Sequence, residues 1–217
     1  MNYNVFFIAD LHIQHKNILH HSKERINAMN LKDANDIDGH DEYIINLFHN
    51  QVKRGDHVYI LGDFIMANQE ISRKILQRIK SKGCKLHLIV GNHDKSTEKM
   101  ENEFESIDLI KVANFKSNVF PFIEEENFQI VMCHYPMKSW FNKCRGSLMM
   151  YGHVHDNSPW MDDTNDLTLN VGFDCPMSNY QFFTLEQVYE FYKKKLNGIS
   201  PEKYSDEICK IDKTYIR

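Results

Sequence analysis

Several absences in this 217-residue sequence exclude common classes of protein. No apolar segment reaches the length of about 18 residues that a membrane-spanning helix requires, so we expect no membrane association. The first four residues carry no basic side chain, and the apolar run after them stops at Asp10, which predicts a first strand and not a signal peptide. The five cysteines are odd in number and have no C-x-x-C spacing, which indicates reduced thiols in a cytoplasmic protein.

Linkers, internal repeats and low-complexity segments are also absent from the sequence. A chain of this length with 42% hydrophobic residues can bury one large core and has little length left for a second. We therefore expect a single domain over residues 1–217, with a polar extension from about residue 198 to residue 217. The acidic loop at residues 156–166 argues against a long nucleic acid as partner.

Apolar, strand-like runs alternate with helical patterns along the chain, which predicts an α/β fold with a largely buried sheet system. Apolar residues at helical spacing predict three helices, over residues 44–52, 71–79 and 185–196. Thr184 is the expected N-cap of the third helix, and Gly198 is its expected end. Two strand-like runs between residues 107 and 133 predict an antiparallel hairpin around polar residues 124–127.

The most informative feature of the sequence is a set of five polar segments, here called the ligand blocks, each of which directly follows a strand-like run. The ligand blocks are Asp10-Leu11-His12, Gly62-Asp63, Gly91-Asn92-His93-Asp94, His134, and Gly152-His153-Val154-His155. Because buried strands place the residues that follow them along one rim of a sheet, we expect these side chains to converge. Their carboxylate, imidazole and amide oxygen donors suit divalent metals such as Mn, Fe, Zn or Ni. A pair of metals about 3.5–4 Å apart needs a shared ligand, for which the Asp63 carboxylate is the candidate.

In this order, the ligand blocks resemble the D-x-H, G-D, G-N-H-D, H and G-H-x-H signature of the calcineurin-like metallophosphoesterases. The resemblance extends from residue 10 to residue 155, and residues 11–17 are also similar to small bacterial and phage members that lack a capping domain. It implies two packed, mostly mixed β-sheets flanked by helices, with two divalent metals at the carboxyl-terminal rim of the strands. The implied ligands are Asp10, His12 and His155 for one metal, Asn92, His134 and His153 for the other, and Asp63 as the bridge. His93 resembles the family's histidine near the leaving group, with Asp94 beside it.

The resemblance implies an enzyme that hydrolyses phosphodiesters or phosphomonoesters, those of nucleotides included, by means of a hydroxide that bridges two metals. Mn is the first expectation for the metal, before Fe, Zn or Ni. His93 is then the expected proton donor to the leaving group, and Asp94 is expected to orient His93. Two alternatives remain. A nuclease of the same chemistry would need a basic groove or an added capping domain, and a non-catalytic metal-binding scaffold would be expected to have lost ligands.

Residues in the loops after the ligand blocks are expected to contact a small phosphoester or nucleotide substrate. The candidates are His15, Asn17, Tyr135 and Arg145. For Tyr135 and Trp140, stacking on a base competes with burial as core aromatics. The remaining histidines, at positions 20, 21, 40, 49, 57 and 87, are expected to have surface or packing roles. The sequence does not indicate an oligomeric state.

Overall fold

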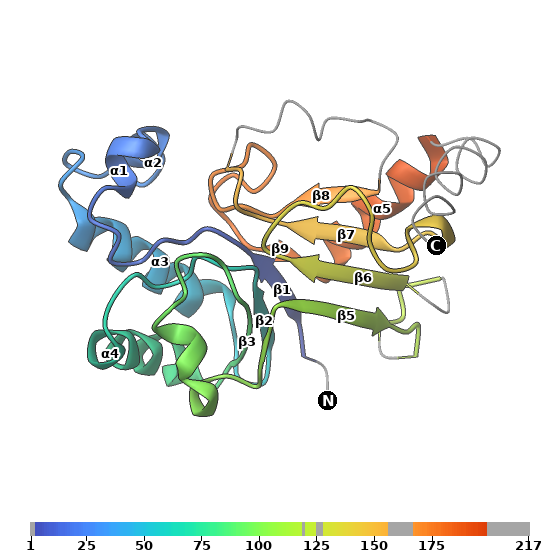
Figure 1. Ribbon diagram of the computed structural model, residues 1–217, viewed down its shortest axis with the longest axis horizontal. Coiled ribbons are helices and arrows are strands. Elements are labelled where there is room, and N and C mark those ends of the chain that lie inside the picture. The colour runs from blue at the N-terminus through green and yellow to red at the C-terminus, as the bar shows by residue number, and fades with distance from the viewer. Residues whose placement is uncertain (1–2, 119, 125–127, 156–166, 199–217) are drawn as a thin grey trace, which may run out of the picture.

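The computed structural model describes residues 3–118, 120–124, 128–155 and 167–198, and within them the chain forms two β-sheets flanked by helices (Figure 1). The first sheet has the strand order β4-β3-β2-β1-β9. Its strands are β1 (Val5–Ile8), β2 (His57–Ile60), β3 (Lys85–Ile89), β4 (Ser106–Asp108) and β9 (Phe183–Thr184). Strands β1 to β4 run parallel, and β9 pairs antiparallel with β1.

The second sheet has the order β5-β6-β7-β8. Its strands are β5 (Ile110–Phe115), β6 (Phe128–Cys133), β7 (Leu148–Tyr151) and β8 (Thr168–Asn170). Strands β5 and β6 form the antiparallel hairpin that the sequence predicts, with Ile110 opposite Cys133. Strands β6, β7 and β8 run parallel. Both sheets are therefore mixed, which confirms the expected fold class.

Each of the three long helices overlaps one of the three helical patterns of the sequence, although the first begins at residue 37 and not at residue 44. They are α3 (Ile37–Gln51), α4 (Gln69–Ile79) and α5 (Leu185–Gly198). The shorter elements are α1 (Ile18–His21), α2 (Glu24–Ala28), and the 3-10 turns η1 (Lys80–Lys82), η2 (Thr97–Lys99), η3 (Glu101–Glu103) and η4 (Lys143–Arg145). None of the helices in the described ranges is long and apolar enough to cross a membrane.

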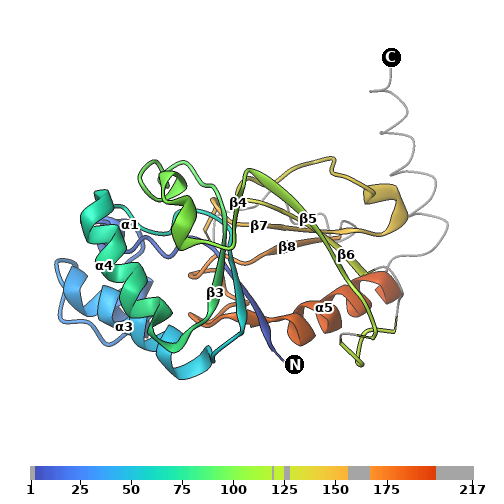
Figure 2. The ribbon, with the colours of Figure 1, turned by 90° about the horizontal axis from the view of Figure 1, so that it is seen from below.

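Alternating side chains divide the first sheet between two apolar cores. Phe6 and Ile8 of β1 pack with α3 and α4 on the outer face of the sheet. Val5 and Phe7, on the other face, pack with residues of the second sheet and of α5. Figure 2 shows α3 and α4 on one side of the first sheet and the second sheet on its other side. Because both faces are covered, these strands are continuous apolar runs in the sequence and not alternating ones.

Thr184 caps α5 as predicted. Its hydroxyl accepts a hydrogen bond from the Gln187 N–H at 3.2 Å, and the Gln187 side chain accepts one from the Thr184 N–H at 2.9 Å, which is a reciprocal capping box. In α4, Ile75 and Ile79 are buried, but Ile71 is 38% exposed. Ile71 lies in the first turn of the helix, outside the buried stripe that Ile75 and Ile79 share.

The two sheets meet at one rim. Ala9, which follows β1, donates its N–H to the Val171 carbonyl at 2.9 Å and accepts from the Phe173 N–H at 2.9 Å. This connection is a parallel bridge between Ala9 and Gly172, so the parallel strands of both sheets end at the same rim. The ligand blocks follow β1, β2, β3, β6 and β7, and the fold therefore brings them to this rim.

The described cysteines have free thiols, as expected. Cys84, Cys133 and Cys175 are buried, and Cys144 is half-buried. The acidic loop at residues 156–166, the polar extension beyond residue 198 with Cys209, and the turn residues 125–127 lie outside the described residues.

Candidate metal centre

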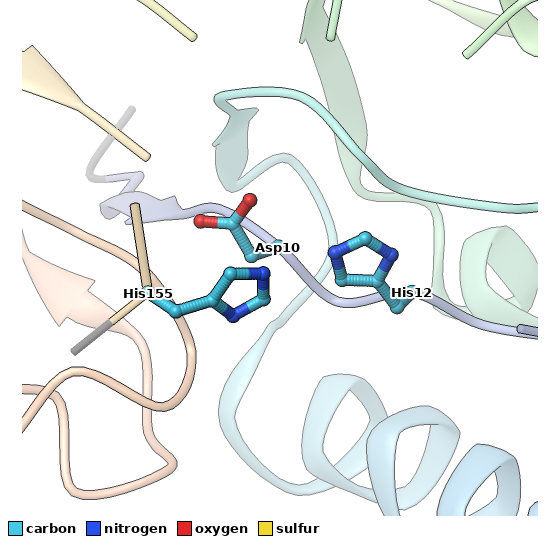
Figure 3. A group of neighbouring side chains, drawn as sticks. All are labelled: Asp10, His12 and His155. Carbon is cyan, nitrogen blue, oxygen red and sulfur yellow. The ribbon is translucent and has the colours of Figure 1, made fainter. Parts of the chain in front are cut away.

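The first ligand group consists of Asp10, His12 and His155, and one donor atom of each lies within 4.8 Å of the others. Asp10 and His12 follow β1 and His155 follows β7, so the group joins two segments that are far apart in the sequence (Figure 3). Asp10 is fully buried, and His12 is 3% exposed. The Asp10 carboxylate accepts a hydrogen bond from the His153 N–H at 2.9 Å, which ties it to the last ligand block.

The second ligand group consists of Asp63, His134 and His153, whose donor atoms also lie within 4.8 Å of one another. The Asn92 side-chain oxygen is 3.2 Å from His134 Nε2, so the predicted amide ligand lies beside this group. His134 Nδ1 is 2.8 Å from the Leu61 carbonyl oxygen. Since a carbonyl oxygen only accepts, Nδ1 carries the proton and Nε2 has a lone pair available for a metal.

Asp63 lies between the two ligand groups. Its Oδ2 atom is 3.7 Å from His12 Nε2 in the first group and 3.6 Å from His134 Nε2 in the second. Its Oδ1 atom accepts a hydrogen bond from the His93 N–H at 2.9 Å, which fixes the orientation of the carboxylate. One oxygen atom is thus within reach of both groups, as a ligand shared by two metals requires.

The backbone at the ligands is in an unusual conformation. Positive φ angles occur at Asp10 (57°), His12 (53°), Asp63 (52°), His153 (72°) and His155 (51°). A non-glycine residue in this region costs on the order of 1–3 kcal/mol and persists only where the surrounding structure enforces it. Such residues concentrate at functional sites, and here they coincide with five of the predicted ligands.

Glycines beside the ligands leave room for the ligand side chains. Gly62 has a φ of +86°, and a Cβ atom at this position would collide with His134 Nδ1. A Cβ atom at Gly152 would lie 2.5 Å from the Ala9 Cβ and 2.6 Å from Asp10 Oδ2. Both contacts are far inside van der Waals distance, so an alanine at either position would displace a ligand.

The electrostatics of the centre fit divalent cations. Both ring nitrogens of His12 are buried and have no hydrogen-bond partner among the described residues. Burial, together with the charge of Arg25, holds the pKa of His12 far below its ordinary value, so the ring is neutral. Burial also raises the pKa of Asp10 to about 7. A bound cation would offset both the unpaired imidazole and the desolvated carboxylate, and the nitrogen and oxygen donors suit Mn, Fe, Zn or Ni.

Asp94 is fully buried behind the centre. Its carboxylate accepts hydrogen bonds from the N–H groups of Asp63 at 2.8 Å, Gly91 at 2.8 Å and Phe64 at 2.9 Å. In the described part of the chain, no hydrogen bond joins Asp94 to the His93 ring. Asp94 therefore holds the turns that carry Asp63 and Asn92, which corrects the expectation that it orients the His93 imidazole.

His93, His15 and Tyr135 surround the centre. The His93 ring is exposed, and its centroid is 5.6 Å from that of His12 and 5.9 Å from that of His15. His15 has a buried Nδ1 atom that lacks a hydrogen-bond partner among the described residues. The Tyr135 hydroxyl is 3.5 Å from the Asn92 side-chain oxygen. Asn17 is exposed at the start of α1, and among the described residues no hydrogen bond joins its side chain to a ligand.

Two further candidates, Arg145 and Trp140, lie away from the centre. Arg145 is exposed on η4, and its neighbour Asn142 donates a hydrogen bond to the Gln129 side chain near the start of β6. Because β6 and β7 are parallel, the loop between them returns to the opposite end of the strands, which places Arg145 far from the rim. The Trp140 indole is 6% exposed and donates to the Ser147 carbonyl at 3.1 Å. Arg145 as a substrate contact is therefore a wrong expectation, and Trp140 is a core aromatic.

Two buried charged residues beside the first ligand group were missed by the sequence analysis. Asp174 lies 2.8 Å from His155 Nδ1, and Arg25 lies 2.9 Å from Asp174. Burial lowers the pKa of His155, but the hydrogen bond and charge of Asp174 outweigh burial and raise it overall. A signal for Asp174 was present, since it follows Gly172 after an apolar run, as the ligand blocks do. Nothing comparable marks Arg25.

A family model for calcineurin-like phosphoesterases matches residues 3–195 of this chain. The chain is 24% identical over 197 residues to the Gene 66 protein of Mycobacterium phage D29, covering 79% of this chain and 88% of that protein. It is 23% identical over 193 residues to the uncharacterized protein MJ1445 of Methanocaldococcus jannaschii, covering 88% and 92%. The crystal structure of a protein of unknown function from Aquifex aeolicus, AQ665, matches with a TM-score of 0.66 and 22% identity, over 88% of this chain and 100% of that chain. This last likeness shows that the two chains share a fold.

Proposed function

The chain belongs to the calcineurin-like phosphoesterase family, and we propose that it hydrolyses phosphodiesters or phosphomonoesters with two divalent metal ions, Mn first among the candidates. The observation that carries this proposal is the position of Asp63 Oδ2, within 3.7 Å of a nitrogen of the first ligand group and 3.6 Å of one of the second. A scaffold that had lost catalysis would not need to keep a shared carboxylate between two complete ligand groups.

The ligands divide into three roles. Asp10, His12 and His155 would hold one metal, and Asn92, His134 and His153 would hold the other. Asp63 would be shared. When bound, two such cations supply Lewis acidity, which lowers the pKa of a coordinated water and offsets the charge on the phosphoryl oxygens. Within this frame, no protein side chain needs to act as the nucleophile.

His93 is the proposed proton donor to the leaving group. Its side chain is exposed, while its backbone N–H donates to Asp63 Oδ1 at 2.9 Å. The ring can therefore meet a leaving oxygen although its backbone stays in place. An alkoxide leaves slowly without a proton, so a positioned imidazole accelerates the reaction most for alkyl and ribose esters.

A cavity of about 400 Å³ next to His93 is the proposed place of the leaving group. Its lining residues are Met66, Ala67, Asn68, Asn92, His93, Lys95 and Ser96. Lys95 contributes an ammonium group and His93 an imidazole to this lining, and the other members are apolar, amide or hydroxyl side chains. The combination suits a polar leaving group with one negative charge and a flat apolar part, as a nucleotide has. Tyr135 and His15 are the proposed substrate contacts on the other sides of the centre.

A substrate screen on metal-quantified protein tests the proposal. The protein would be loaded in turn with Mn, Fe, Zn and Ni, and assayed with nitrophenyl phosphate, bis-nitrophenyl phosphate, cyclic nucleotides, dinucleotides and single-stranded DNA. We expect hydrolysis of at least one small ester by protein that carries two metal equivalents. The matched variants are Asp63→Asn, which should be inactive, and Asp56→Asn, which alters a carboxylate that is 2% exposed at the start of β2 and should stay active. Protein with two bound metals and no activity on any ester would overturn the proposal.

A further inference from the structure

Asp174 determines which nitrogen of His155 is free. Its two carboxylate oxygens lie 2.9 Å and 2.8 Å from His155 Nδ1. A carboxylate only accepts hydrogen bonds, so Nδ1 carries the proton and Nε2 keeps a lone pair. Metal-binding histidines commonly depend on such a partner, which fixes both the tautomer and the plane of the ring.

Arg25 compensates the charge of Asp174 and holds the first ligand block at the same time. The residue is fully buried. Its Nε and Nη2 atoms donate to Asp174 Oδ2 at 3.1 Å and 2.9 Å. Nη2 also donates to the Asp10 carbonyl at 2.7 Å, and Nη1 donates to the Leu11 carbonyl at 3.2 Å. One guanidinium thus connects the residue behind His155 with the turn that carries Asp10 and His12.

The same chain of hydrogen bonds continues to α3. Arg25 Nη1 is 3.1 Å from His40 Nε2, and because a guanidinium only donates, His40 accepts at Nε2. Its Nδ1–H therefore donates to Asp41 Oδ1 at 2.9 Å. Asp41 in turn accepts from the Gln14 N–H at 3.1 Å. Gln14 has a φ of +64°, so both ends of the strained turn from Asp10 to Gln14 are held by this network.

We propose that Asp174 and Arg25 are positioning residues that set the metal affinity of the first ligand group and leave that of the second largely unchanged. The proposal rests on the proposed function in so far as it takes both groups to bind metal. The contacts support this selectivity, since the network touches His155, Asp10 and Leu11 of the first group's segments. The hydrogen bonds given above for the His134 and Asn92 side chains of the second group involve neither Asp174 nor Arg25, and His153 of that group contacts the first group through its backbone N–H, which donates to the Asp10 carboxylate.

A buried ion pair that only stabilises the fold is the competing explanation. Removal of either partner would then lower the stability of the whole protein and weaken both metal sites to a similar extent. The two explanations differ in site selectivity and in the tautomer of His155, and neither of these is a measure of activity.

Metal titration of variants separates the two explanations. The titration would use metal-free protein and Mn²⁺ alone, and elemental analysis would quantify the bound metal. The proteins compared are the wild type and the variants Asp174→Ala, Asp174→Asn and Arg25→Lys. His155→Ala and His153→Ala identify the binding steps of the first and second groups. Asp56→Asn is the matched control, because this buried carboxylate accepts from the Asn4 and Lys53 N–H groups at 2.7 Å and 2.8 Å, at the end of β2 that lies away from Asp63.

We expect Asp174→Ala to weaken the first site by about 10 to 100-fold, the usual effect of losing a hydrogen-bond partner of a metal ligand. Asp174→Asn should lose less, because its amide oxygen still accepts from Nδ1–H. Arg25→Lys should also weaken the first site, since one ammonium cannot reach Asp174 and both carbonyls in the same fixed geometry. The ¹⁵N spectrum of metal-free protein should show His155 protonated at Nδ1 in wild type and shifted toward Nε2 protonation in Asp174→Ala.

Three results would overturn the inference. In the first, Asp174→Ala binds two equivalents of Mn²⁺ with wild-type affinities. In the second, both sites weaken equally in Asp174→Ala, as in a protein that has only lost stability. In the third, wild type itself binds no divalent metal, which would also end the proposed function. The first two leave the proposed function intact when wild-type hydrolysis persists, so the two failures are distinguishable.

Discussion

Removal of metal should destabilise this protein strongly. Without a cation, the centre holds Asp10 fully buried with a pKa raised to about 7 by burial, and His12 with two buried nitrogens that lack partners among the described residues. A metal that binds only the folded chain stabilises it by RT ln(1 + [L]/Kd), which is about 2.7 kcal/mol per site at 100 times Kd. Two sites give about 5 kcal/mol. For a chain of this size each kcal/mol corresponds to about 2–4 °C, so chelation should lower the Tm by about 10–20 °C.

Scanning calorimetry measures this effect directly. The protein would be melted with Mn²⁺ at 100 times its Kd, again after chelation and dialysis, and again after Mn²⁺ is restored, with metal content determined each time. Asp63→Asn is the control, because a neutral amide in the shared position should bind little metal and show a much smaller change in Tm. If the chelator removes both equivalents from wild type and the Tm stays the same, the reasoning that the empty centre is strained and desolvated is refuted.

Three further predictions concern single side chains. Asp63→Asn should abolish activity and lower the metal content of both sites, whereas His155→Ala should mainly empty one; two full equivalents in Asp63→Asn would contradict the shared position. His93→Ala should keep both metals and lose about 10²–10⁴-fold in kcat on a nucleoside phosphodiester, with a much smaller loss on bis-nitrophenyl phosphate, whose phenolate leaves readily. Equal losses on the two esters would argue against proton donation. Burial lowers the pKa of His87 from 6.5 to about 4, so the unfolded chain binds more protons in this range and stability should fall as the pH drops from about 6.5 to 4. In urea unfolding of metal-free protein, His87→Phe should lose less free energy of unfolding than the wild type over this pH range. An equally steep loss in the variant would show that His87 is not its cause.

The sequence predicts the strands before the ligand blocks because their apolar runs are long and each ends at a polar residue. The same reasoning places the ligands at one rim, since parallel strands share a direction. Very short strands cannot be predicted in this way, because their sequence pattern is too short. Strand β9 has two residues, Phe183 and Thr184, and it forms because it pairs with its neighbour β1 at the edge of the sheet. Its formation depends on a partner far away in the sequence and not on its own pattern.

The misplacement of Arg145 has a different cause. The loop from residue 135 to residue 147 begins at a ligand block, and this proximity in sequence suggested proximity in space. The loop connects two parallel strands, however, so it must return along the length of the sheet before β7 can begin. Residues near its start, such as Tyr135, remain at the rim, and residues near its end do not. The parallel pairing of β6 and β7 therefore decides which half of the loop can reach substrate.

The burial of Arg25 cannot be predicted from the sequence, for a related reason. Its guanidinium is compensated by Asp174, which is 149 residues away in the sequence, and a charged residue in a short helix is normally exposed. The bridge between Ala9 and Gly172, where the two sheets join, places the Asp174 segment next to the segment that follows β1 and leads to this helix. The partner of a buried charge is thus a consequence of the complete fold, which local patterns do not contain.

The chemistry of the ligands explains why such a network is needed at all. The turn after β1 requires left-handed backbone at Asp10, His12 and Gln14, with φ angles of 57°, 53° and 64°. Glycine would adopt this conformation without strain, but glycine has no side chain with which to bind a metal. Gly62, which contributes no ligand, is a glycine with a φ of +86°, whereas the ligand positions must carry a carboxylate or an imidazole and accept about 1–3 kcal/mol of strain each. That cost has to be offset by tertiary contacts, and the hydrogen bonds of Arg25 to the Asp10 carbonyl and of Asp41 to the Gln14 N–H lie where the turn requires them.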